Sequence, residues 1–114
     1  MRSILLSILF AVVSTFFTSP AQAQFYSGND LLERLQSRHT ERNMLALGYT
    51  AGVFDTGYNV LWCDVSPEVR VGQLADIARR YLEKNPGTRH YPARTLVFHA
   101  FSEAFPSCEK SSDN

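Results

Sequence analysis

Apolar residues recur at helical spacing in four separate stretches of the chain, with polar residues at the positions between them. The first stretch, "SGNDLLERLQSR", opens with residue types that favour turns and helix caps. Its leucines then fall on one face of a helix: Leu31, Leu32 and Leu35. This pattern predicts a short amphipathic helix whose charged residues face solvent.

The second stretch, "HTERNMLALGYTAGVFDTGYNVLW", predicts a longer helix with Thr40 as its N-cap. It runs to Phe54 or one turn beyond, where "DTGYN" ends or kinks it. Gly48 and Gly52 stand one turn apart inside this helix, and each costs about 1 kcal/mol relative to alanine. No phosphate-loop pattern surrounds them, so we interpret both as structural. We expect another helix backbone to approach closely there.

Two further helices are predicted in the C-terminal half of the chain. The stretch "VGQLADIARRYLEKN" ends at Pro86 and Gly87, and "YPARTLVFHAFSEAF" restarts with Pro92 in its first turn. The expected inward-facing residues are Val71, Leu74, Ile77, Ala78, Tyr81 and Leu82 in the first, and Leu96, Val97, Ala100, Phe101, Ala104 and Phe105 in the second. No stretch alternates with period two. The chain therefore predicts an all-α, four-helix domain.

The first 23 residues have the features of a secretory signal peptide. Arg2 supplies the positive start, an uncharged apolar run follows, and Ala21 and Ala23 form an A-x-A cleavage site. The alternative is a membrane anchor, but this run is shorter than the roughly 20 apolar residues that span a bilayer. We predict cleavage after Ala23, export of the chain, and a mature domain of residues 24–114.

Cys63 and Cys108 are the two cysteines of the chain. In an oxidising compartment an even number of cysteines favours a disulfide, and small exported domains often use one for stability. The alternatives are a metal pair and a reactive thiol. Zinc is disfavoured because the cysteines stand far apart, without a CxxC motif or paired histidines. We predict a Cys63–Cys108 disulfide.

Charge and motifs argue against several functional classes. The chain has 11 basic and 11 acidic residues, and no basic stripe of the kind that binds nucleic acid. His39, His90 and His99 are scattered, and no G-x-S-x-G, H-E-x-x-H or glycine-rich phosphate loop occurs. We therefore expect a binding module, with no catalytic residue, cofactor or metal site.

The segment "NPGTRHYPA" between the last two predicted helices is the candidate functional site. Arg89 and His90 could bond the last carbonyls of the preceding helix and complement its negative end. We interpret them as structural, with direct recognition as the alternative. The tip of the loop, Asn85, Gly87 and Thr88, is the predicted partner contact, because binding sites are often built on supported loops.

Taken in order, three segments of the chain resemble the Rap/Tai family of exported immunity proteins. They are "SGNDLL", "LGYTAGVFD" and "VRVGQLADIARRYLEKNPGTRHYPARTLVFHAFSEAFPSC", which together cover nearly all of the mature chain. The resemblance implies a small helical periplasmic protein, often a homodimer. It would bind and block a peptidoglycan amidase delivered by type VI secretion.

Two positions depart from the family pattern. Many members carry a second cysteine pair, where this chain has Leu35 and Ala46, so apolar packing between the first two helices is expected instead. One extra residue precedes Cys108 in "FPSC". The alternative function is that of a small periplasmic protein with a structural or stress-related role and no toxin partner, and an enzyme is the third possibility.

Overall fold

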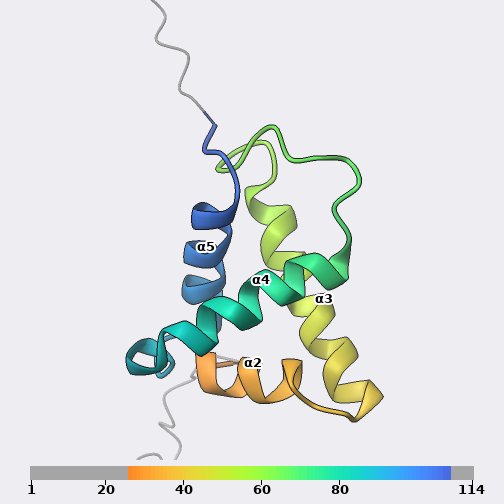
Figure 1. Cartoon of the computed structure of the whole chain (residues 1–114), viewed down its shortest axis with the longest axis vertical. Coiled ribbons are helices and arrows are strands. Elements are labelled where there is room, and N and C mark those ends of the chain that lie inside the picture. Colours follow the sequence, from red (N-terminus) through yellow and green to blue (C-terminus); the bar gives the residue numbers. More distant parts are fainter. Residues whose placement is uncertain (1–25, 109–114) are drawn as a thin grey trace, which may run out of the picture.

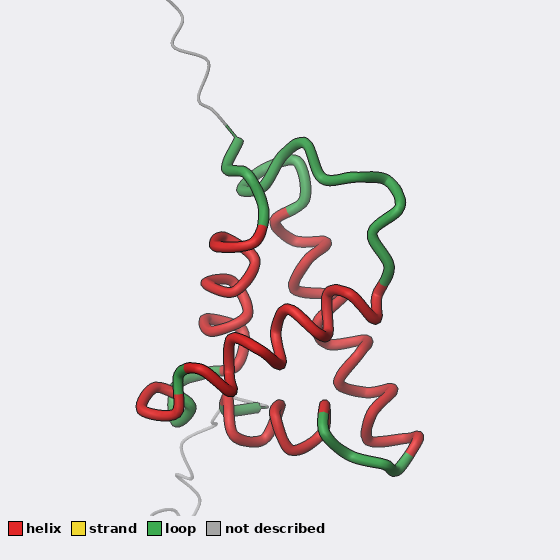
Figure 2. Tube along the Cα trace, viewed as in Figure 1, coloured by secondary structure: helices red, strands yellow, loops and turns green. Residues whose placement is uncertain are grey.

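A computed structural model describes residues 26–108, and these form four α-helices with no strand among them (Figures 1 and 2). The elements are α2 (Gly28–Leu35), α3 (Thr40–Gly57), α4 (Val71–Lys84), the 3₁₀-helix η2 (Pro86–Thr88) and α5 (Ala93–Ala104). The predicted all-α class and its four helices are confirmed. The predicted signal peptide lies outside the described residues.

Helix α4 lies at the centre of the arrangement and packs against the other three helices. In Figure 1 it crosses α3 and α5, while α2 lies across the lower end of the bundle. A long connection from α3 to α4 passes over the upper end, and the short turn containing η2 projects beside the lower end of α5. No helix in the described range is long and apolar enough to cross a membrane.

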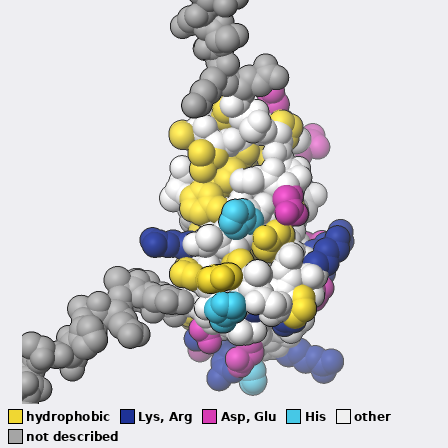
Figure 3. All heavy atoms as spheres, turned by 90° about the vertical axis from the view of Figure 1, so that its left-hand side faces the viewer, with side chains coloured by type: hydrophobic (Ala, Val, Ile, Leu, Met, Phe, Trp, Pro, Cys, Tyr) yellow, Lys and Arg dark blue, Asp and Glu magenta, His cyan; other side chains and the backbone are white. Residues whose placement is uncertain are grey.

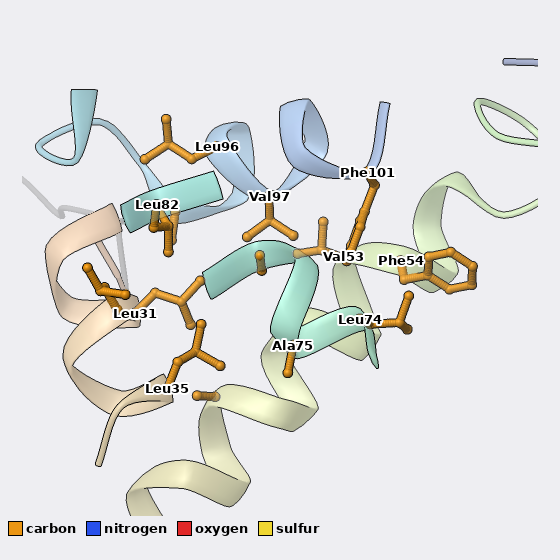
Figure 4. Packing of buried hydrophobic residues seen from close by; sticks show 14 of the residues in the cluster. Leu31, Leu35, Val53, Phe54, Leu74, Ala75, Leu82, Leu96, Val97 and Phe101 are labelled. Atoms are coloured by element: carbon orange, nitrogen blue, oxygen red, sulfur yellow. The ribbon is translucent and has the colours of Figure 1, made fainter. Parts of the chain in front are cut away.

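The core forms where the apolar faces of the four helices meet (Figure 4). Most of the predicted inward positions of α4 and α5 are buried, including Leu74, Ala78, Leu82, Leu96, Val97, Ala100 and Phe101. Two predictions were wrong, because Val71 is 45% exposed and Ala104 is exposed. Each occupies a terminal position of its helix, where the apolar stripe runs past the neighbouring helices.

An aromatic cluster fills the upper end of the bundle. Trp62, only 1% exposed, lies with its ring centroid 5.8 Å from that of Phe54 and 5.6 Å from that of Phe101. Such rings bury large apolar areas and stabilise one another in offset and edge-to-face geometries. The chain therefore reverses direction after α3 in order to bury a loop tryptophan.

The predicted disulfide between Cys63 and Cys108 is present, with the two Cα atoms 4.8 Å apart. The Cys63 amide donates to the Pro106 carbonyl at 2.9 Å, and the Cys108 amide donates to the Leu61 carbonyl at 3.1 Å. These bonds hold the cysteine backbones side by side. Because both sulfurs are used in the disulfide, the metal-pair and free-thiol alternatives are wrong.

The expected close approach at Gly48 and Gly52 was wrong. Both residues are exposed on α3, and a Cβ added to either would meet no atom within 4 Å. Close packing occurs instead at Gly57, where an added Cβ would lie 2.2 Å from the Trp62 ring. The argument that glycine permits close approach holds in this fold, but at a different position of the same helix.

Packing between α2 and α3 agrees with the expectation for the two positions that lack cysteine. Leu35 is 9% exposed and Ala46 is fully buried, and both belong to the same apolar cluster.

Two helix starts differ by one residue from the prediction. His39 and Pro92 are the N-caps of α3 and α5, so Thr40 is the first residue of α3 and Pro92 precedes α5.

Candidate functional site

The α4–α5 loop, residues 85–92, begins with an asparagine that closes α4. Both the backbone amide and the side-chain amide of Asn85 donate to the Tyr81 carbonyl, at 3.1 and 2.8 Å. The Asn85 carbonyl in turn accepts from the Thr88 amide and hydroxyl, at 3.3 and 3.2 Å. These bonds satisfy the carbonyls that a helix end leaves unpaired. They also give η2 a defined shape.

The far side of this loop is hydrogen-bonded to the start of α2. Gly28 donates its amide to the Tyr91 carbonyl at 3.0 Å, and Asn29 donates to the Arg89 carbonyl at 2.9 Å. The Ala93 amide donates to the Tyr26 carbonyl at 2.9 Å. We call these three backbone bonds the latch. The first two cap α2 with carbonyls from a distant part of the chain, and the third caps the start of α5 with the Tyr26 carbonyl, so that together they hold the loop in place.

Gly28 makes the latch possible because it has no side chain. A Cβ at this position would lie 2.8 Å from the Arg89 carbonyl oxygen and 2.4 Å from Leu96 Cδ1. Both distances are shorter than real Cβ contacts. Any larger residue would therefore push the α4–α5 loop away from α2.

A capping box completes the start of α2. The Asp30 amide donates to Ser27 Oγ at 3.2 Å, and the Ser27 amide donates to Asp30 Oδ2 at 3.0 Å. The pKa of Asp30 is lowered, chiefly by the backbone hydrogen bond from Ser27 and then by the Ser27 hydroxyl, which donates at 2.7 Å. The ionised carboxylate therefore stabilises the helix start on which the latch depends.

The expected role of the Arg89 and His90 side chains is not what the structure shows. Within residues 26–108 neither side chain is hydrogen-bonded to the end of α4, where Asn85 serves instead. Arg89 contributes through its backbone carbonyl, and its side-chain Nε is buried with no hydrogen-bond partner in this range. His90 is exposed, with its ring 4.2 Å from the ring of Tyr91. Backbone hydrogen bonds therefore hold the α4–α5 loop in place. Neither basic side chain is needed for those bonds.

The three residues predicted to contact a partner lie together around η2. Gly87 is exposed and has open space around its Cα, while Asn85 and Thr88 are partly buried and bonded to one another. The turn projects from the side of the bundle (Figure 1), and Figure 3 views the molecule from that side. On this face histidine side chains lie beside apolar atoms, with acidic and basic side chains close by. Gly87 is the position at which a partner could approach the backbone without obstruction.

The remaining histidines do not join this loop. His39 lies at the start of α3, beside an open hollow that it lines with Thr40, Glu41 and Arg42. His99 is exposed on α5. Within the described residues, no group of three or more His, Cys, Asp or Glu side chains is placed to hold a metal ion.

The latch was missed by sequence reasoning, although part of its signal is present. "SGND" has the S-x-x-D form of a capping box and places a glycine directly after the cap. That pattern locates the start of α2. It cannot show that carbonyls some 60 residues later would bond the first two amides, because such pairing is set by the tertiary fold.

Comparison with known proteins identifies a family. The family model described as Rap1a immunity proteins matches residues 27–108. The matched range starts at the Ser27 cap and ends at the second cysteine of the disulfide, so it contains all four helices and both latch bonds that cap α2. No curated protein matches the chain.

Proposed function

The chain belongs to the family of Rap1a immunity proteins, and from this membership we propose that it binds and inhibits a peptidoglycan amidase toxin delivered by type VI secretion. The observation that carries the proposal is the family match over the entire described fold. In this role the protein performs no chemistry of its own. By binding a surface of the toxin, the protein prevents the toxin from reaching the cell wall.

The disulfide supports a periplasmic location for this function. Cys63 and Cys108 are joined, as is usual for proteins that mature in an oxidising compartment. The amino-terminal sequence, with Arg2, an apolar run and the A-x-A site ending at Ala23, would direct export and cleavage. An inhibitor placed in the periplasm meets an incoming amidase where its substrate lies.

The α4–α5 loop supports an inhibitory contact made by Asn85, Gly87 and Thr88. It projects from the bundle, and its shape is fixed by Asn85 at one end and by the latch at the other. A loop already held in one conformation loses little entropy on binding. Such a loop is suited to entering the cleft of a peptidase-like toxin.

A co-expression experiment tests the proposal. An amidase-like gene that neighbours the coding sequence is expressed with a periplasmic signal, with and without the full chain. We expect lysis by the amidase alone, and growth when the full chain is present. A form that lacks residues 1–23 should not protect, because it stays in the cytoplasm.

Purified proteins then separate inhibition from other effects. Addition of the mature chain should abolish amidase hydrolysis of isolated peptidoglycan at equal molar amounts. If the oxidised, folded chain neither binds nor slows the enzyme, the immunity proposal is wrong, and a structural or stress-related role without a toxin takes its place. The mass of the mature chain in solution tests the homodimer that the resemblance implies.

A further inference from the structure

The segment from Lys84 to Arg94 carries an unbalanced positive charge. It contains Lys84, Arg89 and Arg94, together with His90, and no aspartate or glutamate. The next carboxylate after Glu83 is Glu103. A chain of zero formal net charge therefore has a local excess of cations in its projecting loop and the adjoining helix ends.

Ion pairs in the described residues leave these cations out. Arg42 pairs with Glu33, Arg79 with Asp76 and Glu83, and Arg80 with Asp76. No such pair within residues 26–108 involves Lys84, Arg89 or Arg94. These cations therefore have no ionic partner among the described residues.

The carboxylate nearest the latch in sequence is committed elsewhere. Asp30 accepts from the Ser27 amide and hydroxyl, and Arg34 is the cation that contributes to its lowered pKa. Arg34 itself lies over the Tyr26 ring, 4.8 Å from its centroid. The capping box thus leaves Arg89 without an anionic partner.

The position of Arg94 is unfavourable for the fold taken alone. Arg94 lies in the first turn of α5, which contains no acidic residue, whereas Arg89 and His90 lie before the Pro92 N-cap. The amino-terminal end of a helix carries a partial positive charge, so a cation in this turn is disfavoured. In addition, Arg89 Nε is buried with no hydrogen-bond partner among residues 26–108. The described fold therefore supplies no ionic partner for Arg89 or Arg94.

We propose that the α4–α5 loop surface, made by Arg89 and Arg94 with Lys84 and His90, binds a carboxylate-rich surface of a partner protein. The proposal rests on the proposed function, because it assigns the chemistry of the toxin face that meets this loop. Arginine suits the role, since its planar group can bond both oxygens of a carboxylate. The latch holds the loop backbone before the partner arrives.

A peptide probe tests the surface without any toxin. Hexaglutamate is titrated into the ¹⁵N-labelled mature protein, with hexaglutamine as the neutral control peptide. Amide shifts should move in residues 84–94 with hexaglutamate only, and fade as salt is raised from about 20 to about 300 mM. The shifts should be lost in the double variant Arg89→Gln and Arg94→Gln. They should remain in Arg38→Gln, which removes an exposed cation from the α2–α3 connection.

The Asn29 amide resonance shows whether the latch is intact in each variant. If the double variant unfolds, the single variant Arg94→Gln replaces it in the peptide titration. No shifts, or shifts centred on Arg38 or Arg70, would overturn the proposal.

With the amidase, the double variant should reduce the association rate at low salt by about tenfold or more and change dissociation less. An unchanged association rate would overturn the proposal while leaving inhibition intact. If the loop binds hexaglutamate but no amidase binds the wild-type chain, the toxin assignment fails and the acidic-partner surface stands.

Discussion

The backbone amide of Asn29 donates a hydrogen bond to the carbonyl oxygen of Arg89 at 2.9 Å. The first helix of the domain is therefore capped by the loop that precedes the last one. Because this contact uses backbone atoms only, the Arg89 side chain can change without removing it. Stability and recognition can thus be altered separately at the same residue.

Gly28→Ala should destabilise the protein by about 1–3 kcal/mol, because the new Cβ overlaps the Arg89 carbonyl and Leu96. Thermal unfolding of the oxidised mature chain measures this loss. Gly48→Ala is the matched control in an open, exposed helical site, and it should raise stability by about 0.5–1 kcal/mol. Equal effects of the two substitutions would contradict the latch packing.

Reduction of the Cys63–Cys108 disulfide should lower the free energy of unfolding by about 4 kcal/mol, since the bond closes a loop with a sequence separation of 45. For a domain of this size that corresponds to a fall in Tm of roughly 15–30 °C. Melting curves with and without reductant measure it. Two titratable thiols in the native, unreduced protein would refute the bond.

Stability should decrease in acid in a manner that depends partly on Asp30. Its folded-state pKa is lowered, so its stabilisation is complete above the unfolded value near 4 and is lost as pH falls through the folded value. Asp30→Asn should therefore flatten the dependence of Tm on pH between about 5 and 2. Ser27→Ala should flatten it only in part, because this change removes the hydroxyl donor but keeps the backbone amide, which lowers the pKa more. An acid limb as steep as that of the wild type in both variants would exclude the capping box as its source.

Gly87→Trp tests the tip of the α4–α5 loop. The position is exposed with open space around it, so Tm should change by no more than the effect of about 0.5 kcal/mol usual for surface sites. If this tip enters the toxin, the added ring should weaken inhibition of the amidase at least tenfold, about 1.4 kcal/mol. Gly72→Trp, at an equally open and exposed site on α4, is the control. If the Gly87→Trp variant still inhibits the amidase fully, the toxin contact lies on another surface.

The apolar stripes of α4 and α5 could be predicted from sequence because each helix is amphipathic, with a single face suited to burial. Helix α3 is different, since apolar residues surround much of it. Met44 and Leu45 are 63% and 57% exposed, while Ala46 is fully buried. The spacing of residues cannot show which face of such a helix is buried. The packing of the other helices against α3 determines it.

The candidate loop could be located from its proline, glycine and basic residues, but its bonding could not be derived from them. Sequence reasoning assigned the bracing to the Arg89 side chain, whereas the structure assigns it to the Arg89 carbonyl. Every residue except proline carries the same backbone donor and acceptor. The amino-acid type therefore gives no information on which carbonyl will reach the start of α2. A glycine that must lie against another backbone is equally hard to single out among several.

The disulfide also divides the chain into two parts that would respond differently to mechanical force. Residues 63–108 form a covalently closed ring that contains α4, η2 and α5, whereas α2 and α3 lie outside it. If the described chain were stretched from its two ends, only the part before Cys63 could lengthen appreciably. The ring would transmit tension through its sulfur bridge while the loop inside it bore none. Force could thus separate α2 from its carbonyl caps without stretching the segment that carries them.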